Sequence, residues 1–253
     1  MRKLRFLSLC ISAVLITALL SGCISVSRGG SNMSVGTVVQ GRGEMVSFTV
    51  DTEDFSSVSI DGIYAVIYRH SGTASLRVEI QENLFEYMRI SAEGGTLRIS
   101  SEAAFNTSNE NRPRLYIYAP ELESVSLGGA VHAGNWDNIS RERLVINLSG
   151  ASQANIEVDV EELYINISGA SNNTFSGRAG RADIRASGAV NISAEQLLTR
   201  DAAVNISGVG IVTIACSETL NAVISGSGSL RYIGSPHVIS NISGVGTIRQ
   251  INP

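Results

Sequence analysis

The residues best suited to chemistry are acidic side chains that lie near arginines in the middle of the chain. Glu157, Asp159 and Glu161 alternate along one segment, and Asp183 and Arg185 follow later. Polysaccharide lyases and hydrolases use clustered carboxylates or an arginine base, so these five residues are candidates for such a site. The simpler interpretation is a solvated edge whose opposite charges pair, with weak calcium or glycan contact as the alternative. We name them weak surface-site candidates and predict no catalytic residue.

Other reactive side chains are scarce or isolated. Lys3 is the only lysine, and it lies in a segment that we expect to be removed, which excludes Schiff-base and phosphate-loop chemistry. His70, His132 and His237 stand apart and form no two-histidine metal motif. Cys216 lies in an apolar run, where a packed thiol is favoured over a nucleophile. We predict no metal and no cofactor.

Composition excludes several classes of protein. Of the 253 residues, 43% are apolar and 17% are charged, which is too apolar and too weakly charged a mixture for general disorder. Three cysteines cannot build a disulfide scaffold, and 25 glycines without a collagen-like period exclude a triple helix. The formal net charge of −4 lacks the basic footprint of nucleic-acid binding, so we predict no nucleic-acid partner.

A repeat that fills the second half of the chain must position these candidates. Its glycine recurs every 18–21 residues, and a degenerate first copy, VSLGGAV, occupies 125–131. This step is too short for helical-hairpin repeats or propeller blades. The six clear copies are INLSGAS (146–152), INISGAS (165–171), IRASGAV (184–190), VNISGVG (204–210), AVISGSG (222–228) and SNISGVG (240–246).

Alternation within each copy predicts strands. Residues two, four and six before the repeated glycine are mostly apolar, whereas the residue three before it is mostly Asn, which indicates a strand with one face inward. Alternation resumes after the glycine, so each copy is predicted to be a strand, a tight bend and a second strand. No copy has room for a crossover helix. We therefore predict an all-β fold, a single-stranded parallel β-helix (solenoid) with about 18–21 residues per coil.

Stacking of coils would align the repeated polar residues. The glycine supplies the backbone conformation of a corner, the serine hydroxyls stack beside it, and each outward Asn bonds to the amide of the next coil. We interpret this array as structural, a product of stacking and duplication, rather than as an active surface. The predicted ladder residues are Ser149, Ser168, Ser187, Ser207, Ser225, Ser243, Gly150, Gly169, Gly188, Gly208, Gly226, Gly244, Asn147, Asn166, Asn205 and Asn241.

The segments on either side of the repeat differ from it. Residues 44–120 alternate as strands without the repeat, and we predict irregular early coils or a cap there. From Ala202 onward the charged residues are Glu218, Arg231 and Arg249, so this surface has little charge to resist association. We expect the final coil to be an exposed edge, and we name a homo-oligomer through this coil as a candidate assembly.

The first residues read as a targeting signal rather than as part of the fold. A basic start precedes an apolar run at 6–20 that is too short for a membrane span, and the run ends in LSGC (20–23). This ending resembles the lipobox of bacterial lipoprotein signal peptides, which implies lipidation of Cys23 and cleavage before it. By resemblance to enterobacterial sorting, Ile24 allows outer-membrane delivery. We predict a lipoprotein signal peptide over 1–22, the lipidated cysteine and a flexible tether over 23–43, and a β-helical domain over 44–253 with regular Ser-Gly coils over 121–253.

The order of these features resembles one known family. A lipobox, weakly repeated strands, a segment such as ELESVSLGGAVHA (121–133) and successive INISGAS-type coils are similar to the bacterial family of the putative auto-transporter adhesin, head GIN domain. The similarity covers roughly residues 50–250. It implies a β-helical, non-enzymatic envelope protein, and it supplies no catalytic residues.

We therefore predict a lipid-anchored protein of the bacterial cell envelope that acts as a non-catalytic, adhesin-like binding or structural module. Its expected place is the outer membrane or the cell surface, with a periplasm-facing placement left open. The expected partners are the membrane, through the lipid, and a glycan or an envelope protein. Two alternatives stay open, namely a polysaccharide lyase or hydrolase on a β-helix and an accessory protein in envelope-stress sensing. Acids and arginines that converge in a cleft would favour the enzyme.

Overall fold

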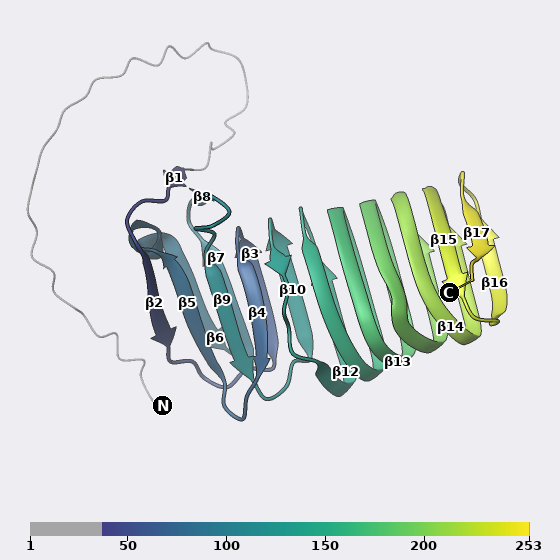
Figure 1. Ribbon diagram of the computed structural model, residues 1–253, viewed down its shortest axis with the longest axis horizontal. Helices are drawn as coiled ribbons and strands as arrows, with labels where there is room; N and C mark the ends of the chain where they lie inside the picture. Colours follow the sequence, from purple (N-terminus) through teal and green to yellow (C-terminus); the bar gives the residue numbers. More distant parts are fainter. Residues whose placement is uncertain (1–36, 253) are drawn as a thin grey trace, which may run out of the picture. The chain divides into compact units, whose positions relative to one another are not determined.

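The computed structural model describes residues 37–252, and these form an all-β domain (Figure 1). The element bounds are β1 Val38–Gln40, β2 Met45–Val50, β3 Ser57–Gly62, β4 Ala65–His70, β5 Ser75–Gln81, the 3₁₀ helix η1 Glu82–Tyr87, β6 Met88–Glu93, β7 Thr96–Ser101, β8 Ala104–Asn106, β9 Arg114–Ala119, β10 Ser124–Gly129, β11 His132–Ala133, β12 Ile139–Leu148, β13 Gln153–Ile206, β14 Val209–Ile224, β15 Ser227–Ile233, β16 His237–Ile242 and β17 Thr247–Gln250. The all-β prediction is confirmed.

The repeated half of the domain pairs in parallel at the repeat distance. In the β12–β13 pair Leu144 lies opposite Leu163, Ile146 opposite Ile165 and Leu148 opposite Ile167. The β13–β14, β14–β15 and β14–β16 pairs are also parallel. β13 extends over 54 residues because the chain continues around the corners without leaving strand geometry. Figure 1 shows these segments side by side along the long axis of the curled sheet.

The N-terminal half departs from this pattern. β2 pairs antiparallel with β5, β5 antiparallel with β9, and β6 antiparallel with β7. The sheet is therefore mixed, and the prediction of a parallel β-helix does not hold across residues 44–253. The physical reason is chain connectivity: adjacent strands such as β6 and β7 are joined by a tight turn at Gly94 and Gly95, both with positive φ, and a tight turn can join only antiparallel neighbours.

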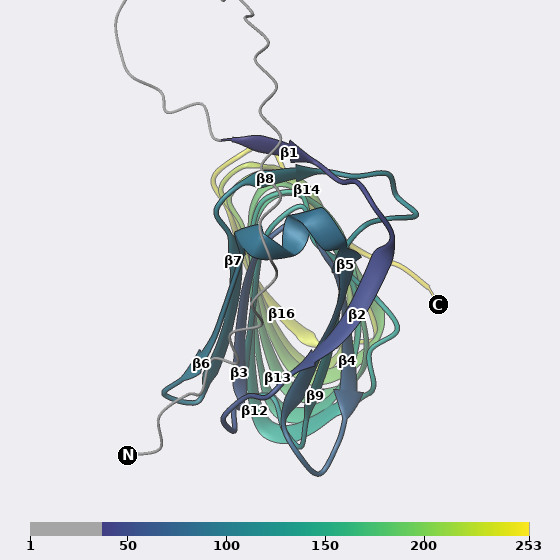
Figure 2. The ribbon, with the colours of Figure 1, turned by 90° about the vertical axis from the view of Figure 1, so that its left-hand side faces the viewer.

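One end of the domain is closed by these irregular elements. η1 lies across that end in Figure 2, with Leu84 fully buried beneath it. β1 pairs with β8 beside it. Phe48 and Phe85 meet edge to face with ring centroids 4.2 Å apart, which adds aromatic packing to the closure. β1 lies inside the 23–43 range assigned to the tether, so ordered pairing begins before residue 44.

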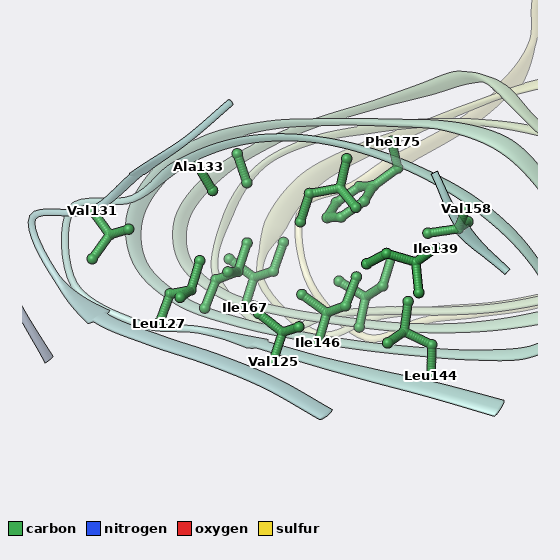
Figure 3. Packing of buried hydrophobic residues seen from close by; sticks show 14 of the residues in the cluster. Val125, Leu127, Val131, Ala133, Ile139, Leu144, Ile146, Val158, Ile167 and Phe175 are labelled. Carbon is green, nitrogen blue, oxygen red and sulfur yellow. The ribbon is translucent and has the colours of Figure 1, made fainter. Parts of the chain in front are cut away.

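The core fills the space between two facing walls. Figure 3 shows Val125, Leu127 and Ile146 from one wall pointing toward Ala133 and Phe175 from the other. All five are at most 1% exposed, because inward positions alternate with outward ones along every strand. Burial of each such large apolar side chain contributes about 1.5–3 kcal/mol. Stacked coils therefore hold the corner residues in fixed register.

The corner glycines explain why the repeat keeps that residue. Gly150, Gly169 and Gly188 have φ of 81°, 108° and 98°, a region that residues with a Cβ rarely adopt. A Cβ on Gly169 would also overlap the carbonyl oxygen of Gly150, and the same overlap recurs at each later copy. Both the backbone conformation and the close stacking of coils thus require glycine at these three corners, whereas stacking alone requires it at Gly208, Gly226 and Gly244.

The predicted signal peptide and the lipidated Cys23 lie outside the described residues. Within residues 37–252, no helix is long and apolar enough to cross a membrane.

Candidate functional site

A shallow groove runs beside the repeated corner and collects eight of the sixteen predicted ladder residues. Its volume is about 530 Å³. We call it the Ser–Asn groove. It is bordered by two rows of side chains that follow the stacking direction, an amide row (Asn147, Asn166 and Asn205, with Arg185 between them) and a hydroxyl row (Ser149, Ser168, Ser187, Ser207 and Ser225). Each row takes one residue from each successive coil because the coils are in register.

The amide row is linked by hydrogen bonds between coils. Asn166 Nδ2 donates to Asn147 Oδ1 at 3.0 Å, and Asn147 Nδ2 donates to Ser126 Oγ at 3.1 Å. These side chains point outward because they are three positions before the corner glycine, on the face opposite to Leu148 and Ile167. The amides are held in place yet keep an exposed edge toward the groove.

The hydroxyl row is bound differently from the predicted ladder of hydroxyl groups. Ser187 Oγ donates to the carbonyl oxygen of Ile167, and Ser207 Oγ to that of Ala186, both at 3.4 Å. These are long hydrogen bonds, and all the serines of the row are exposed. The hydroxyls can therefore exchange these partners for a ligand. Asn241 and Ser243 on the last described coil are also exposed but do not line the groove.

The five acidic and basic candidates do not all lie together. Arg185 lines the Ser–Asn groove and pairs with Asp183 on its own strand, Nε to Oδ1 at 3.2 Å. Asp159 and Glu161 line a different groove, and Glu161 pairs there with Arg200. Glu157 is exposed. Asp159 and Glu161 therefore meet Arg178 and Arg200 in that second groove, whereas Asp183 and Arg185 pair with each other apart from it.

A match to a protein family covers most of this architecture. The family model described as putative auto-transporter adhesin, head GIN domain, matches residues 54–236, which is more than half of the chain. The chain belongs to this family. The resemblance inferred from the repeated corners is therefore confirmed.

Solved structures resemble this head GIN domain in fold. A putative adhesin from Bacteroides fragilis is 23% identical, with a TM-score of 0.77 over 84% of this chain and 100% of its own. A putative adhesin from Parabacteroides merdae is 21% identical, with a TM-score of 0.65 over 85% of this chain and 99% of its own. A putative lipid binding protein from Parabacteroides distasonis is 20% identical, with a TM-score of 0.66 over 85% and 100%. No curated protein matches the chain.

The cysteine of the head GIN domain is packed, as the apolar run around it predicts. Cys216 is 2% exposed, and its Sγ lies 3.2 Å from the carbonyl oxygens of Arg200 and Thr219. Burial raises the pKa of the Cys216 thiol above its ordinary value. The thiol form is therefore favoured, which argues against a nucleophile.

The histidines stand apart in the fold as they do in the sequence. His132 Nδ1 lies 3.2 Å from Gln153 Oε1 in a small hollow rich in amides. In the part of the chain that the structure describes, no group of three or more His, Cys, Asp or Glu side chains is placed to hold a metal ion.

Sequence reasoning named Asp159 and Glu161 in the head GIN domain but not the groove that they line. This second groove, of about 590 Å³, is lined by apolar residues that include Leu198 and Ile233 and by charged residues that include Asp159, Arg178 and Arg200. Leu198 is 59% exposed because the pairing of β13 with β14 shifts register between Ala194 and Leu198. The only signal in the sequence was the uneven coil length near this position.

Proposed function

We propose that this head GIN domain is a non-catalytic binding module of the bacterial cell envelope, whose residues 121–252 form a single-stranded parallel β-helix. The observation that supports it is the Ser–Asn groove, in which amides and hydroxyls from successive coils line one surface. Uncharged amides and hydroxyls can each donate and accept hydrogen bonds, so such a surface can bind polar ligands without turnover.

The ligand we propose is a glycan, with an envelope protein as the alternative. Coils in a parallel sheet are spaced by about 4.8 Å, so each row presents polar groups at regular intervals along the groove. An extended polymer can contact several coils at once, and contacts of moderate strength then add up to useful affinity.

The ion pairs of Arg185 with Asp183 and of Glu161 with Arg200 support a non-catalytic role, since they already engage three of the five charged candidates. A polysaccharide lyase or hydrolase on this fold remains the second proposal, with Asp159 or Arg185 as its base, and an accessory role in envelope-stress sensing is the third. Turnover of a polyuronide by the purified protein, abolished by Asp159→Ala or Arg185→Ala, would overturn the non-catalytic proposal.

We also propose that Cys23 carries the membrane anchor. Several acyl chains on one cysteine give durable attachment, since each buried CH₂ contributes about 0.8 kcal/mol. The full chain should fractionate with membranes and show globomycin-sensitive processing, and Cys23→Ala should release it. Membrane association that Cys23→Ala does not change would contradict the anchor.

A glycan array probed with the full chain tests the binding role. Asn166→Ala combined with Ser168→Ala should weaken binding to any glycan that the unchanged chain retains, because both side chains line the groove. Asn221→Ala is the matched control, since Asn221 is exposed on a neighbouring stretch of strand outside the groove. Equal binding by the double variant and the control would place the ligand elsewhere.

A further inference from the structure

The amide row of the Ser–Asn groove has one break. Asn147, Asn166 and Asn205 carry neutral amides, but the coil between the last two places Arg185 in the same position. Arg185 is the one charged residue among those that line the groove. A single guanidinium therefore stands in an otherwise neutral row, with the carboxylate of Asp183 beside it on the same strand.

Arg185 keeps donors free for a ligand. Its Nε and Nη2 are directed to the two carboxylate oxygens of Asp183, at 3.2 and 3.4 Å. A guanidinium has five N–H donors, so this pairing uses only part of its capacity. The Arg185 side chain is 66% exposed, whereas that of Asp183 is 21% exposed. Asp183 thus fixes the orientation of the Arg185 guanidinium, and the remaining N–H donors of Arg185 are left for a ligand.

The side chains open to a ligand around Arg185 are polar. Ser187 lies two residues beyond it on the same strand and lines the groove, whereas Leu148, Ile167 and Ala186, which also border it, are at most 4% exposed. A pyranose ring presents hydroxyls at its rim and C–H groups on its faces. The hydroxyls of such a ring can therefore reach the amides and hydroxyls of the two rows.

The charge of the protein indicates which kind of acidic ligand could bind at Arg185. The chain carries a formal net charge of −4, and one arginine cannot offset the dense phosphates of a nucleic acid. A glycan in which neutral sugars flank one carboxylate fits a groove with one arginine between neutral amides better than a nucleic acid does. Guanidinium is also well suited in geometry to a carboxylate.

We propose that the Ser–Asn groove binds a linear acidic glycan that lies along the stacking direction and places a uronate carboxylate on Arg185. This inference rests on the proposed function of the groove as a glycan-binding surface and adds the ligand class and the residue that selects it. The neutral amides and hydroxyls bind the sugar hydroxyls of any glycan, whereas Arg185 distinguishes acidic from neutral chains.

Titration calorimetry on the full chain tests this selection with oligogalacturonate and a neutral galactan oligomer of the same length. The unchanged chain should bind the acidic oligomer at least about tenfold more tightly, because hydrogen bonds to charged groups are the stronger ones. Arg185→Asn, which restores the residue type of the row, should remove this preference, so that the two oligomers bind with equal affinity. Arg143→Asn is the matched control, since Arg143 is an exposed arginine that pairs with Glu162 and does not line the groove.

The outcomes separate this inference from the proposed function. Equal affinity for both oligomers, or a preference that Arg185→Asn leaves intact, would overturn the acidic-glycan assignment while the groove remains a glycan site. No binding of either oligomer would also overturn the acidic-glycan assignment, while the glycan array decides the proposed function separately. If an aspartate-rich peptide binds and the oligomers do not, and if Arg185→Asn abolishes that binding, the ligand is an acidic protein segment. That result would refute the proposal that the ligand is a glycan.

Discussion

Asn166 donates a hydrogen bond from Nδ2 to Oδ1 of Asn147, which lies one coil earlier, at 3.0 Å. The two residues are 19 positions apart and directly opposite in the parallel pairing of β12 with β13. The same side chains that join two coils therefore also form the edge of the Ser–Asn groove. The amide row therefore contributes both to the stability of the fold and to the groove. Its contribution to stability can be measured separately from ligand binding.

Asn166→Ala should lower the free energy of unfolding by about 0.5–1.5 kcal/mol, because it removes the hydrogen bond between coils. Asn221→Ala, at an exposed position on the same wall, should change it by less than about 0.5 kcal/mol. Urea unfolding followed by circular dichroism measures both. Equal losses would show that the amide row adds nothing beyond an ordinary exposed residue.

Gly169→Ala should destabilise the domain by at least about 2 kcal/mol. The residue has φ of 108°, and its Cβ would overlap the carbonyl of Gly150, so strain and steric overlap add. Gly72→Ala is the control, because open space surrounds Gly72 and its φ lies outside the left-handed region. Thermal unfolding should separate the two variants by many degrees. A tolerated Gly169→Ala would contradict the stacked corner.

Cys216 should resist alkylation in the folded chain. Burial raises its pKa, so the thiolate fraction at pH 8 is smaller than for an ordinary cysteine, and access is blocked as well. Iodoacetamide labelling, measured by mass spectrometry on the peptide that contains Cys216, should be slow without urea and fast with it. Rapid labelling of the native chain would refute the packed thiol.

The same pKa shift predicts a pH dependence of stability. A raised folded pKa means that the stability from the neutral thiol is complete below the ordinary cysteine pKa of about 8.5 and is lost as pH rises toward the folded value. Cys216→Ala should therefore flatten the fall in unfolding free energy above pH 8.5. An unchanged slope would assign that fall to other groups.

Tyr64 extends this argument to higher pH. Burial is the main cause that raises its pKa to about 12, and the nearby Asp61 carboxylate adds to the rise, against a smaller opposing effect of Ser101. The stability it contributes should be complete below pH 10 and lost between pH 10 and about 12. Tyr64→Phe cannot ionise, so unfolding midpoints in that range should fall less steeply for the variant. Parallel curves would show that Tyr64 is not the group responsible.

Much of the repeated half was predictable, because local and global preferences agree there. The alternation around Ile146, Ile165 and Val204 predicted inward strands, and all three are at most 2% exposed. The N-terminal half was not predictable in the same detail. Alternation at β5 or β6 has the same period whether a strand pairs in parallel or antiparallel, so its topology had to come from the fold.

The candidate site shows the same division. The repeat placed Asn147, Asn166 and the corner serines in columns, which is why their alignment follows from the sequence. Nothing in the sequence showed that Ser187 would bond to a main-chain carbonyl rather than to another hydroxyl. Nor did it show that Asp159 and Arg185 would line different grooves, since that depends on where each coil turns.

The sequence by itself determined the all-β class, the repeat and the residues of each column, because period and spacing are local properties of the chain. Only the tertiary structure decided the mixed sheet, the end closed by η1, and the division of charged residues between two grooves. Those features depend on the direction in which strands meet and on the length of each coil. Arg185 is an example of both. The sequence determines its position in the amide column, and the fold determines which of its donors are paired with Asp183.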